Sequence, residues 1–192
     1  GVFNLNEGDF EGVSVSGAAN FHMGESTNGG LFTGALNYTH GDFKGVMMSG
    51  AANVAQGQSN GWLLSGAANV LLPKNLLSEN ALDLDAQSKG VMISGGANIA
   101  MQNFNGTQIS GGLNYANKMK GVQIGVVNIA KQMDGYTFGL INIVGDGVMD
   151  VSLSYNELDF TMLGFKSGSQ KSFSQWSFGK HKDLEIYNIG YT

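Results

Sequence analysis

An asparagine recurs at the same place in every repeat of the chain, and this column is the strongest candidate for a functional array. The positions are Asn4, Asn20, Asn37, Asn53, Asn69, Asn98, Asn114, Asn128 and Asn142. A row of amides can line a pore or bind a glycan, and it can equally satisfy backbone groups or stack as an internal ladder. A residue at one place in every unit normally serves the architecture, so we favour the structural role.

The other reactive side chains are scattered rather than clustered. They are His22, His40 and His181, the carboxylates Glu7, Asp9, Glu11, Asp83 and Asp85, and the repeat serines Ser16, Ser49, Ser65, Ser94 and Ser110. The histidines lack metal-ligand spacing, and the serines lack a nucleophile elbow. The Asp83–Asp85 pair lacks the later ligands of a calcium loop. We therefore predict no catalytic, cofactor-binding or metal-binding residues, and no enzymatic activity.

The composition excludes several further classes. The chain has no cysteine, which removes disulfides and thiolate sites. All its basic residues are lysines and its net charge is −5, so it has no electrostatic footprint for nucleic acid. The 30 glycines disfavour helices, because a helical glycine costs about 1 kcal/mol relative to alanine. Strands joined by glycine turns fit this composition better.

Self-alignment shows a repeat, which positions the asparagines. Its consensus is Gly, apolar, variable, apolar, Ser, Gly, small, small, Asn, apolar. The leading glycines are Gly12, Gly29, Gly45, Gly61, Gly90, Gly106, Gly121 and Gly135, and a ninth unit is cut off at the start. We expect a repeat region over 1–147, with a leucine-rich insert at 71–89. Residues 148–192 leave the repeat but keep strand-like alternation, so we expect them to be antiparallel strands of the same sheet.

Side-chain type alternates with a period of two inside each unit, as in a β-strand. In the unit from Gly45, the apolar face comprises Val46, Met48, Gly50, Ala52 and Val54. The opposite, small and polar face comprises Met47, Ser49, Ala51, Asn53 and Ala55. The alternation leaves open whether the apolar face contacts lipid, a second layer or a neighbouring protein. We expect it to contact lipid in a membrane protein, or to form the interior of a soluble one.

The all-β repeats can stack in two ways. An antiparallel meander closed into an outer-membrane-type β-barrel suits strands of about ten residues with one apolar face. A parallel β-solenoid with one coil per repeat suits near-identical units of 15 or 16 residues. The intervals after Gly121 fall to 14 and 12 residues, which a regular coil tolerates poorly. The units from Gly121 and Gly135 also lack the serine, which reverses side-chain parity unless a bulge or a corner absorbs the deletion. We prefer the barrel and keep the solenoid as the alternative.

The insert is the place where the chain departs from its own repeat. It is leucine-rich and is compatible with a short helix that Ser78 would cap. Insertions into repeats often mark a binding face, although such a loop can also simply cover an edge. The candidate partner-contact residues are Leu76, Leu77, Leu82 and Leu84.

Two segments, Gly106-Thr-Gln-Ile-Ser-Gly-Gly-Leu-Asn-Tyr-Ala116 and Gly121-Val-Gln-Ile-Gly-Val-Val-Asn-Ile-Ala130, carry a resemblance to a known family. They resemble the G-V-Q-I-S-G-L-V-N-V-A repeats of surface proteins from Gram-negative bacteria, notably Bacteroidetes and spirochaetes. The resemblance covers nearly the whole chain, but most units here lack the family's glutamine. It implies a location in the outer membrane or at the cell surface, and it supplies no catalytic residues.

We therefore expect a non-enzymatic outer-membrane barrel that acts as a pore, a scaffold or a component of an envelope complex. Its partner would be the lipid bilayer or an envelope protein. The alternative is a soluble, secreted or surface-tethered β-repeat module that binds a protein or a glycan.

Overall fold

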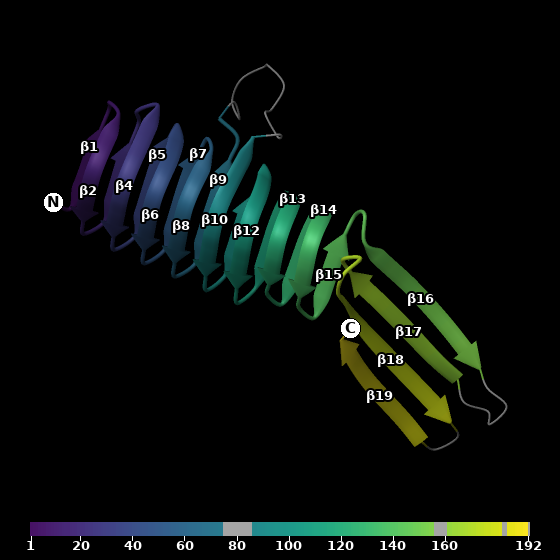
Figure 1. The fold of residues 1–192 in the computed structure, drawn as a ribbon. Coiled ribbons are helices and arrows are strands. Elements are labelled where there is room, and N and C mark those ends of the chain that lie inside the picture. Colours follow the sequence, from purple (N-terminus) through teal and green to yellow (C-terminus); the bar gives the residue numbers. More distant parts are fainter. Residues whose placement is uncertain (75–85, 156–160, 182–183, 192) are drawn as a thin grey trace.

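The computed structural model describes residues 1–74, 86–155, 161–181 and 184–191, all of them in strands or their connections (Figure 1). The repeats form a parallel β-solenoid, and the residues after it form a four-stranded antiparallel sheet. The all-β prediction is confirmed. Within the described residues, no helix is long and apolar enough to span a membrane.

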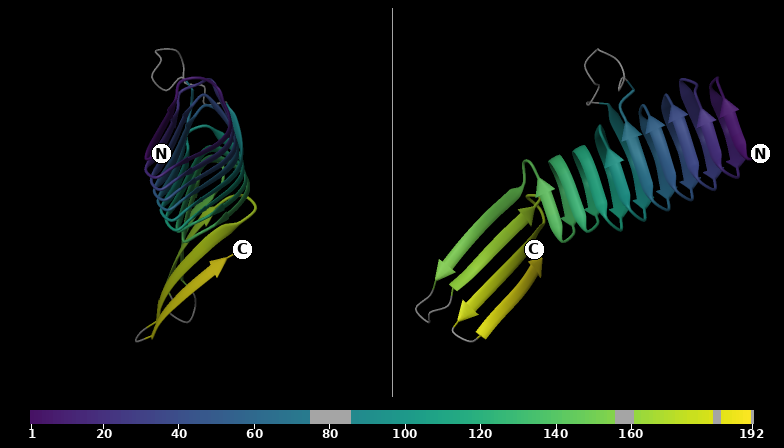
Figure 2. Two further views of the ribbon diagram at one scale, coloured as in Figure 1. Left: turned by 90° about the vertical axis from the view of Figure 1, so that its left-hand side faces the viewer. Right: turned by 180° about the vertical axis from the view of Figure 1, so that it is seen from behind.

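Each coil of the solenoid contributes one long and one short stretch of strand, so the solenoid has two sheets. The long-strand sheet contains β2 (Phe10–Ser16), β4 (Ser26–Thr33), β6 (Asp42–Ser49), β8 (Ser59–Ser65), β10 (Gln87–Ser94), β12 (Asn103–Ser110) and the second halves of β13 (Leu113–Ile124) and β14 (Val127–Phe138). The short-strand sheet contains β1 (Phe3–Asn6), β3 (Ala19–His22), β5 (Leu36–His40), β7 (Ala52–Gln56), β9 (Ala68–Leu72), β11 (Ala97–Ala100), the first halves of β13 and β14, and β15 (Ile141–Val144). Seen from the end, the coils superimpose as a flattened ring (Figure 2, left).

The expected antiparallel meander and outer-membrane-type barrel are wrong, and the solenoid alternative is correct. Every pairing between repeats is parallel and joins identical repeat positions, as in Gly29 with Gly45 and Asn37 with Asn53. Only parallel stacking pairs each repeat position with itself, so near-identical units build the same column coil after coil. A meander would pair each unit with the reversed order of its neighbour.

The missing serine and the shortened intervals are absorbed at the corners. Ile109 pairs with Ile124 and Leu113 pairs with Val127, so the deletion falls in the corner between the two strands. The opposite corner shortens as well, because Ala100 pairs with Ala116 and Phe104 pairs with Met119. The strand registers and the inward positions are therefore unchanged. The last interval, which ends at Gly147, is no coil, because the chain leaves the solenoid there.

The interior contains the face that the sequence analysis described as small and polar. Met47, Asn53 and Ala55 are fully buried inside the coil, whereas Met48 is 44% exposed on the outside. The expectation that the apolar face forms the interior is therefore wrong. Four inward columns fill the core, with Phe43, Met47, Asn53 and Ala55 as their members in one coil. The inward apolar contacts come mainly from methionine, leucine, alanine and phenylalanine. The outward apolar residues therefore do not contribute to the core.

The asparagine column is a continuous ladder inside the solenoid. Each amide donates one hydrogen bond of 2.8–3.0 Å to the asparagine of the next coil, from Asn4 through to Asn142. Each also donates 2.7–3.1 Å bonds to a backbone carbonyl of the next coil's long strand. This second bond ties the two sheets together across the interior. The column thus has the architectural role that we favoured.

Residues after the solenoid form a separate sheet of β16 (Val148–Tyr155), β17 (Thr161–Gly168), β18 (Phe173–His181) and β19 (Leu184–Tyr191), rather than extending the sheet of the repeats. Serines at the turn between β17 and β18 cap the last coil. The bonds run from the Thr137 amide to Ser172 Oγ (2.9 Å), from the Asn142 amide to Ser167 Oγ (3.4 Å), from Asn142 Nδ2 to Ser174 Oγ (3.3 Å), and from Ser169 Oγ to the Gly135 carbonyl (2.9 Å). These serine hydroxyl groups therefore make the hydrogen bonds to the last coil that a following coil would otherwise make.

Candidate binding surface

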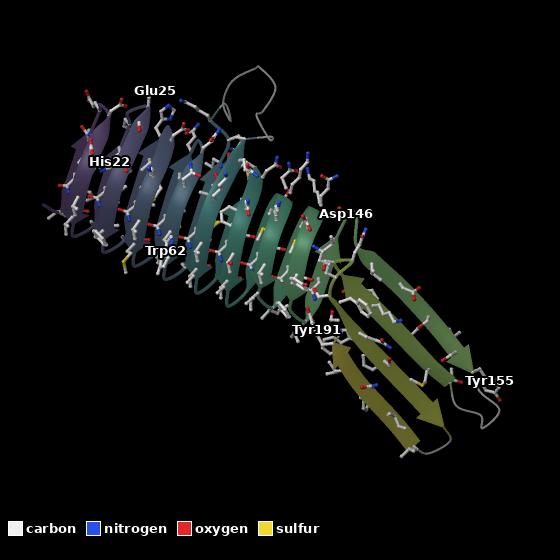
Figure 3. All side chains as sticks on the ribbon, viewed as in Figure 1. His22, Glu25, Trp62, Asp146, Tyr155 and Tyr191 are labelled. Atoms are coloured by element: carbon white, nitrogen blue, oxygen red, sulfur yellow. The ribbon has the colours of Figure 1, made fainter. Side chains whose placement is uncertain are left out.

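The outer side of the long-strand sheet is a continuous apolar surface, here called the apolar outer face. The first and third residues after each leading glycine point outward there. They are Val13 and Val15, Gly30 and Phe32, Val46 and Met48, Trp62 and Leu64, Val91 and Ile93, Thr107 and Ile109, Val122 and Ile124, and Tyr136 and Phe138. None of these positions is charged, and every one is at least partly exposed. Trp62 is 58% exposed and stands on the outside of the rod (Figure 3).

A column of glycines lets the coils stack closely enough to build this surface. Gly45 has a φ of 138°, which side chains of L-residues rarely adopt. A Cβ added at Gly45 would overlap the backbone oxygen of Gly29 in the preceding coil. Glycine is therefore required at this position for the coils to pair at the ordinary strand spacing, and the identical register of successive coils places the outward side chains in straight rows along the solenoid.

A groove of about 430 Å³ lies in the apolar outer face, on the side where the long strands end. Its lining residues come from four successive coils: Phe32, Thr33, Met48, Ser49, Leu64, Ser65 and Ile93. The hydroxyl oxygens of Ser49 and Ser65 are buried and have no hydrogen-bond partner. Because these oxygens are covered, the groove presents mainly apolar atoms to a ligand.

A row of polar residues borders the opposite side of the face, at the position before each leading glycine. The row contains Glu11, Asn28, Lys44, Asn60, Lys89, Asn105, Lys120 and Asp134. These side chains are largely exposed and carry both signs of charge. An apolar centre with a polar border is the usual anatomy of a protein–protein interface.

A second hollow, of about 360 Å³, lies at a corner near the C-terminal end of the solenoid and is lined by both charged and apolar side chains. Lys118, Lys120, Asp134 and Asp146 are among its lining residues. Asp134 accepts a 2.7 Å hydrogen bond from Lys171, and the hydrogen bond and charge of Lys171 lower the pKa of the Asp134 carboxyl. Asp146 Oδ1 accepts a hydrogen bond from the Met133 amide. Both carboxylates thus have partners that hold the structure together.

Among the residues that the structure describes, the histidines and carboxylates considered in the sequence are not brought together, and Asp83 and Asp85 lie outside these residues. His22 is buried inside the first coils, where its ring contacts Phe10 with 4.3 Å between centroids. His40 Nδ1 lies 3.4 Å from Gln56 Oε1. Asp9 and Asp42 each accept a hydrogen bond from a backbone amide at a corner. In the part of the chain that the structure describes, no three histidine or acidic residues are grouped as a metal site would need.

The candidate contact residues of the insert, Leu76, Leu77, Leu82 and Leu84, lie outside the described residues, as does Ser78. The sequence left open whether the apolar face contacts lipid, a second layer or a neighbouring protein, and it did not place this face on the outside of a solenoid, because the preferred barrel has a different stacking. The repeat sequence nevertheless contained a signal for this outward apolar surface. The asparagine marks the inward face wherever a ladder forms, so the opposite apolar face must point outward.

Comparisons with family models, with curated proteins and with solved structures find no match for this chain.

Proposed function

We propose that this chain is a non-enzymatic β-solenoid module that binds a partner protein through the apolar outer face. The observation that carries the proposal is the absence of charge at the first and third positions after every leading glycine, from Val13 to Phe138. Contiguous exposed apolar surfaces of this extent are rare on proteins that act alone and typically mark interaction sites. The earlier preference for an outer-membrane barrel is withdrawn, because the repeats form a parallel solenoid.

The chemistry of the face favours a protein over a glycan. A glycan site needs many side chains that can hydrogen-bond to sugar hydroxyls, and among the sixteen outward positions only Trp62, Thr107 and Tyr136 offer such a group. Straight rows of side chains at the strand spacing of about 4.8 Å instead match another β-sheet packed face to face. The surface-repeat resemblance supports placing this partner at the envelope of a Gram-negative cell.

Photo-crosslinking in the native host tests the proposal with a pair of positions on one strand. A photoreactive amino acid replaces Trp62 on the apolar outer face or Asn60 on its polar border, both of which are exposed in β8. We expect a protein adduct of defined mass from position 62 and little or none from position 60. The adduct identifies the partner for a binding measurement with purified components.

That measurement compares two lysine substitutions. Trp62→Lys puts a charge in the centre of the face, and we expect it to weaken binding at least about tenfold, which corresponds to about 1.4 kcal/mol. Asn60→Lys adds the same charge at the border and should change affinity little. Equal effects of the two substitutions, or equal crosslinking at both positions, would refute the proposal. Retention on immobilised glycans without any protein adduct would support the glycan alternative instead.

A further inference from the structure

The C-terminal sheet is one layer thick and has two chemically different faces. Its apolar face carries Met149, Val151, Leu153, Tyr155, Leu163, Phe165, Trp176, Phe178, Tyr187, Ile189 and Tyr191. Its other face carries polar and small residues over much of its area, including Asp150, Ser152, Ser154, Gly164, Lys166, Gln175, Ser177, Gly179, Asn188 and Gly190. The sheet projects beyond the end of the rod, so the solenoid does not lie against its apolar face except at the root (Figures 1 and 2).

The root of this sheet is fixed to the last coil. Trp176 Nε1 donates a 3.0 Å hydrogen bond to the Leu140 carbonyl. The Tyr191 ring stacks on Phe138 with 5.4 Å between centroids. The apolar face is therefore held in a defined position, next to the end of the apolar outer face.

Beyond the root, the apolar face has no cover among the described residues. Leu153 is 75% exposed, Tyr187 is 68% exposed, and Val151 and Ile189 are each 67% exposed. A sheet with one hydrophobic face becomes stable when that face packs against a second layer. The second layer must therefore come from another molecule or from outside the described residues.

We propose that a second copy of this chain covers the apolar face, so that two C-terminal sheets pack face to face as an eight-stranded sandwich. The available area fits this occupant. Eight residues of the face each expose 45% to 75% of their surface: Met149, Val151, Leu153, Leu163, Phe178, Tyr187, Ile189 and Tyr191. Taking about 200 Å² for a large side chain, they offer roughly 1,000 Å² per copy. A stable interface needs about 800 Å² per partner.

Charge and shape also suit a two-fold pair. The charged residues on this face are Lys180 and Glu185, which are direct cross-strand neighbours, so the face is neutral and does not repel its own copy. A hollow of about 590 Å³ on this face is lined by Leu163, Phe178 and Tyr187 and also by Thr161 and the Lys180–Glu185 pair. The exposed aliphatic row of β16, from Met149 to Leu153, is the matching ridge. In a two-fold pair each copy supplies both features, as an isologous interface requires.

Sedimentation velocity of the full chain over a range of micromolar concentrations tests this inference. We expect the mass to rise from 20.2 kDa to twice that value and to stop there. Leu153→Glu should weaken the dimer at least about tenfold, because it places a charge in the dry interface. Ser154→Glu, on the next residue of the same strand and on the opposite face, should leave the dimer intact.

Two controls keep the outcome interpretable. Far-ultraviolet circular dichroism shows whether each variant folds, and a Leu153→Ser variant replaces Leu153→Glu if that variant does not. Trp62→Lys should still dimerise, so failure of this inference is separable from failure of the proposed function. A wild-type chain that stays monomeric, a mass that rises without limit, or equal weakening by Leu153→Glu and Ser154→Glu would overturn it. Association only on added phospholipid vesicles would likewise overturn it and would identify lipid as the cover.

Discussion

Removing one amide from the middle of the asparagine ladder should destabilise the solenoid severely. Asn53 is fully buried, and its Oδ1 accepts a 2.9 Å hydrogen bond from Asn37. Its Nδ2 donates to Asn69 Oδ1 at 2.9 Å and to the Leu64 carbonyl at 2.7 Å. Asn53→Ala removes these three bonds together with a longer one of 3.4 Å from Nδ2 to the Met47 carbonyl, and it provides no water-accessible replacement.

The magnitude follows from the groups left without their partner. The Leu64 carbonyl and the Asn69 side-chain oxygen each lose a donor. Asn37 loses an acceptor, but it still donates to Met48 O and Leu31 O. An unsatisfied buried polar group costs about 1–3 kcal/mol, so for these two acceptors we expect a loss of about 2–6 kcal/mol in the free energy of unfolding.

Equilibrium unfolding in urea, followed by far-ultraviolet circular dichroism, measures this loss. The matched control is Asn60→Ala, which removes the same amide from an exposed position and should change stability by no more than about 0.5 kcal/mol. If Asn53→Ala costs no more than Asn60→Ala, the ladder does not hold the coils together and the reasoning fails.

Two further predictions concern the interior and the coil spacing. Burial lowers the pKa of His22 below its usual value of 6.5, so the unfolded chain takes up the proton first. The free energy of unfolding should therefore fall as the pH drops below about 6.5, by at most about 1.4 kcal/mol per pH unit, and urea titrations at several pH values should show that His22→Leu removes this slope. Gly45→Ala should cost at least about 3 kcal/mol, because it combines an unfavourable φ with overlap on Gly29. Gly8→Ala, where an added Cβ meets no atom within 4 Å, should cost little, and comparable thermal midpoints for the two variants would contradict this account of the glycine column.

The repeat and its period-two alternation were sufficient to predict an all-β fold and an architectural asparagine column. The stacking direction was not decided by alternation, because a strand presents the same two faces in a meander and in a solenoid. Identity of successive units was the better guide, since only parallel coils bring Asn37 beside Asn53 and Gly29 beside Gly45. The shortened units are incompatible with a regular coil only if the missing residue falls within a strand. The structure places it at a corner, where the number of residues is free to vary.

The candidate surface was harder to predict because burial depends on which face closes on itself. Inward methionines and leucines at the position of Met47 supply enough apolar packing to accompany the polar asparagines. The outward valines and isoleucines were therefore not needed for the core. The bare face of the C-terminal sheet could not be inferred either, since alternation along β16 does not say whether anything covers it.

Thiol labelling tests most directly whether the apolar face points outward. The chain has no cysteine, so a single cysteine can be introduced at Met48 or at its neighbour Met47 without a background signal. Met48 is 44% exposed and Met47 is fully buried. In the folded chain we predict rapid reaction of Met48→Cys with a maleimide, and reaction of Met47→Cys only after unfolding. Protection of position 48 together with rapid labelling of position 47 would contradict the inward asparagine ladder and the apolar outer face at once.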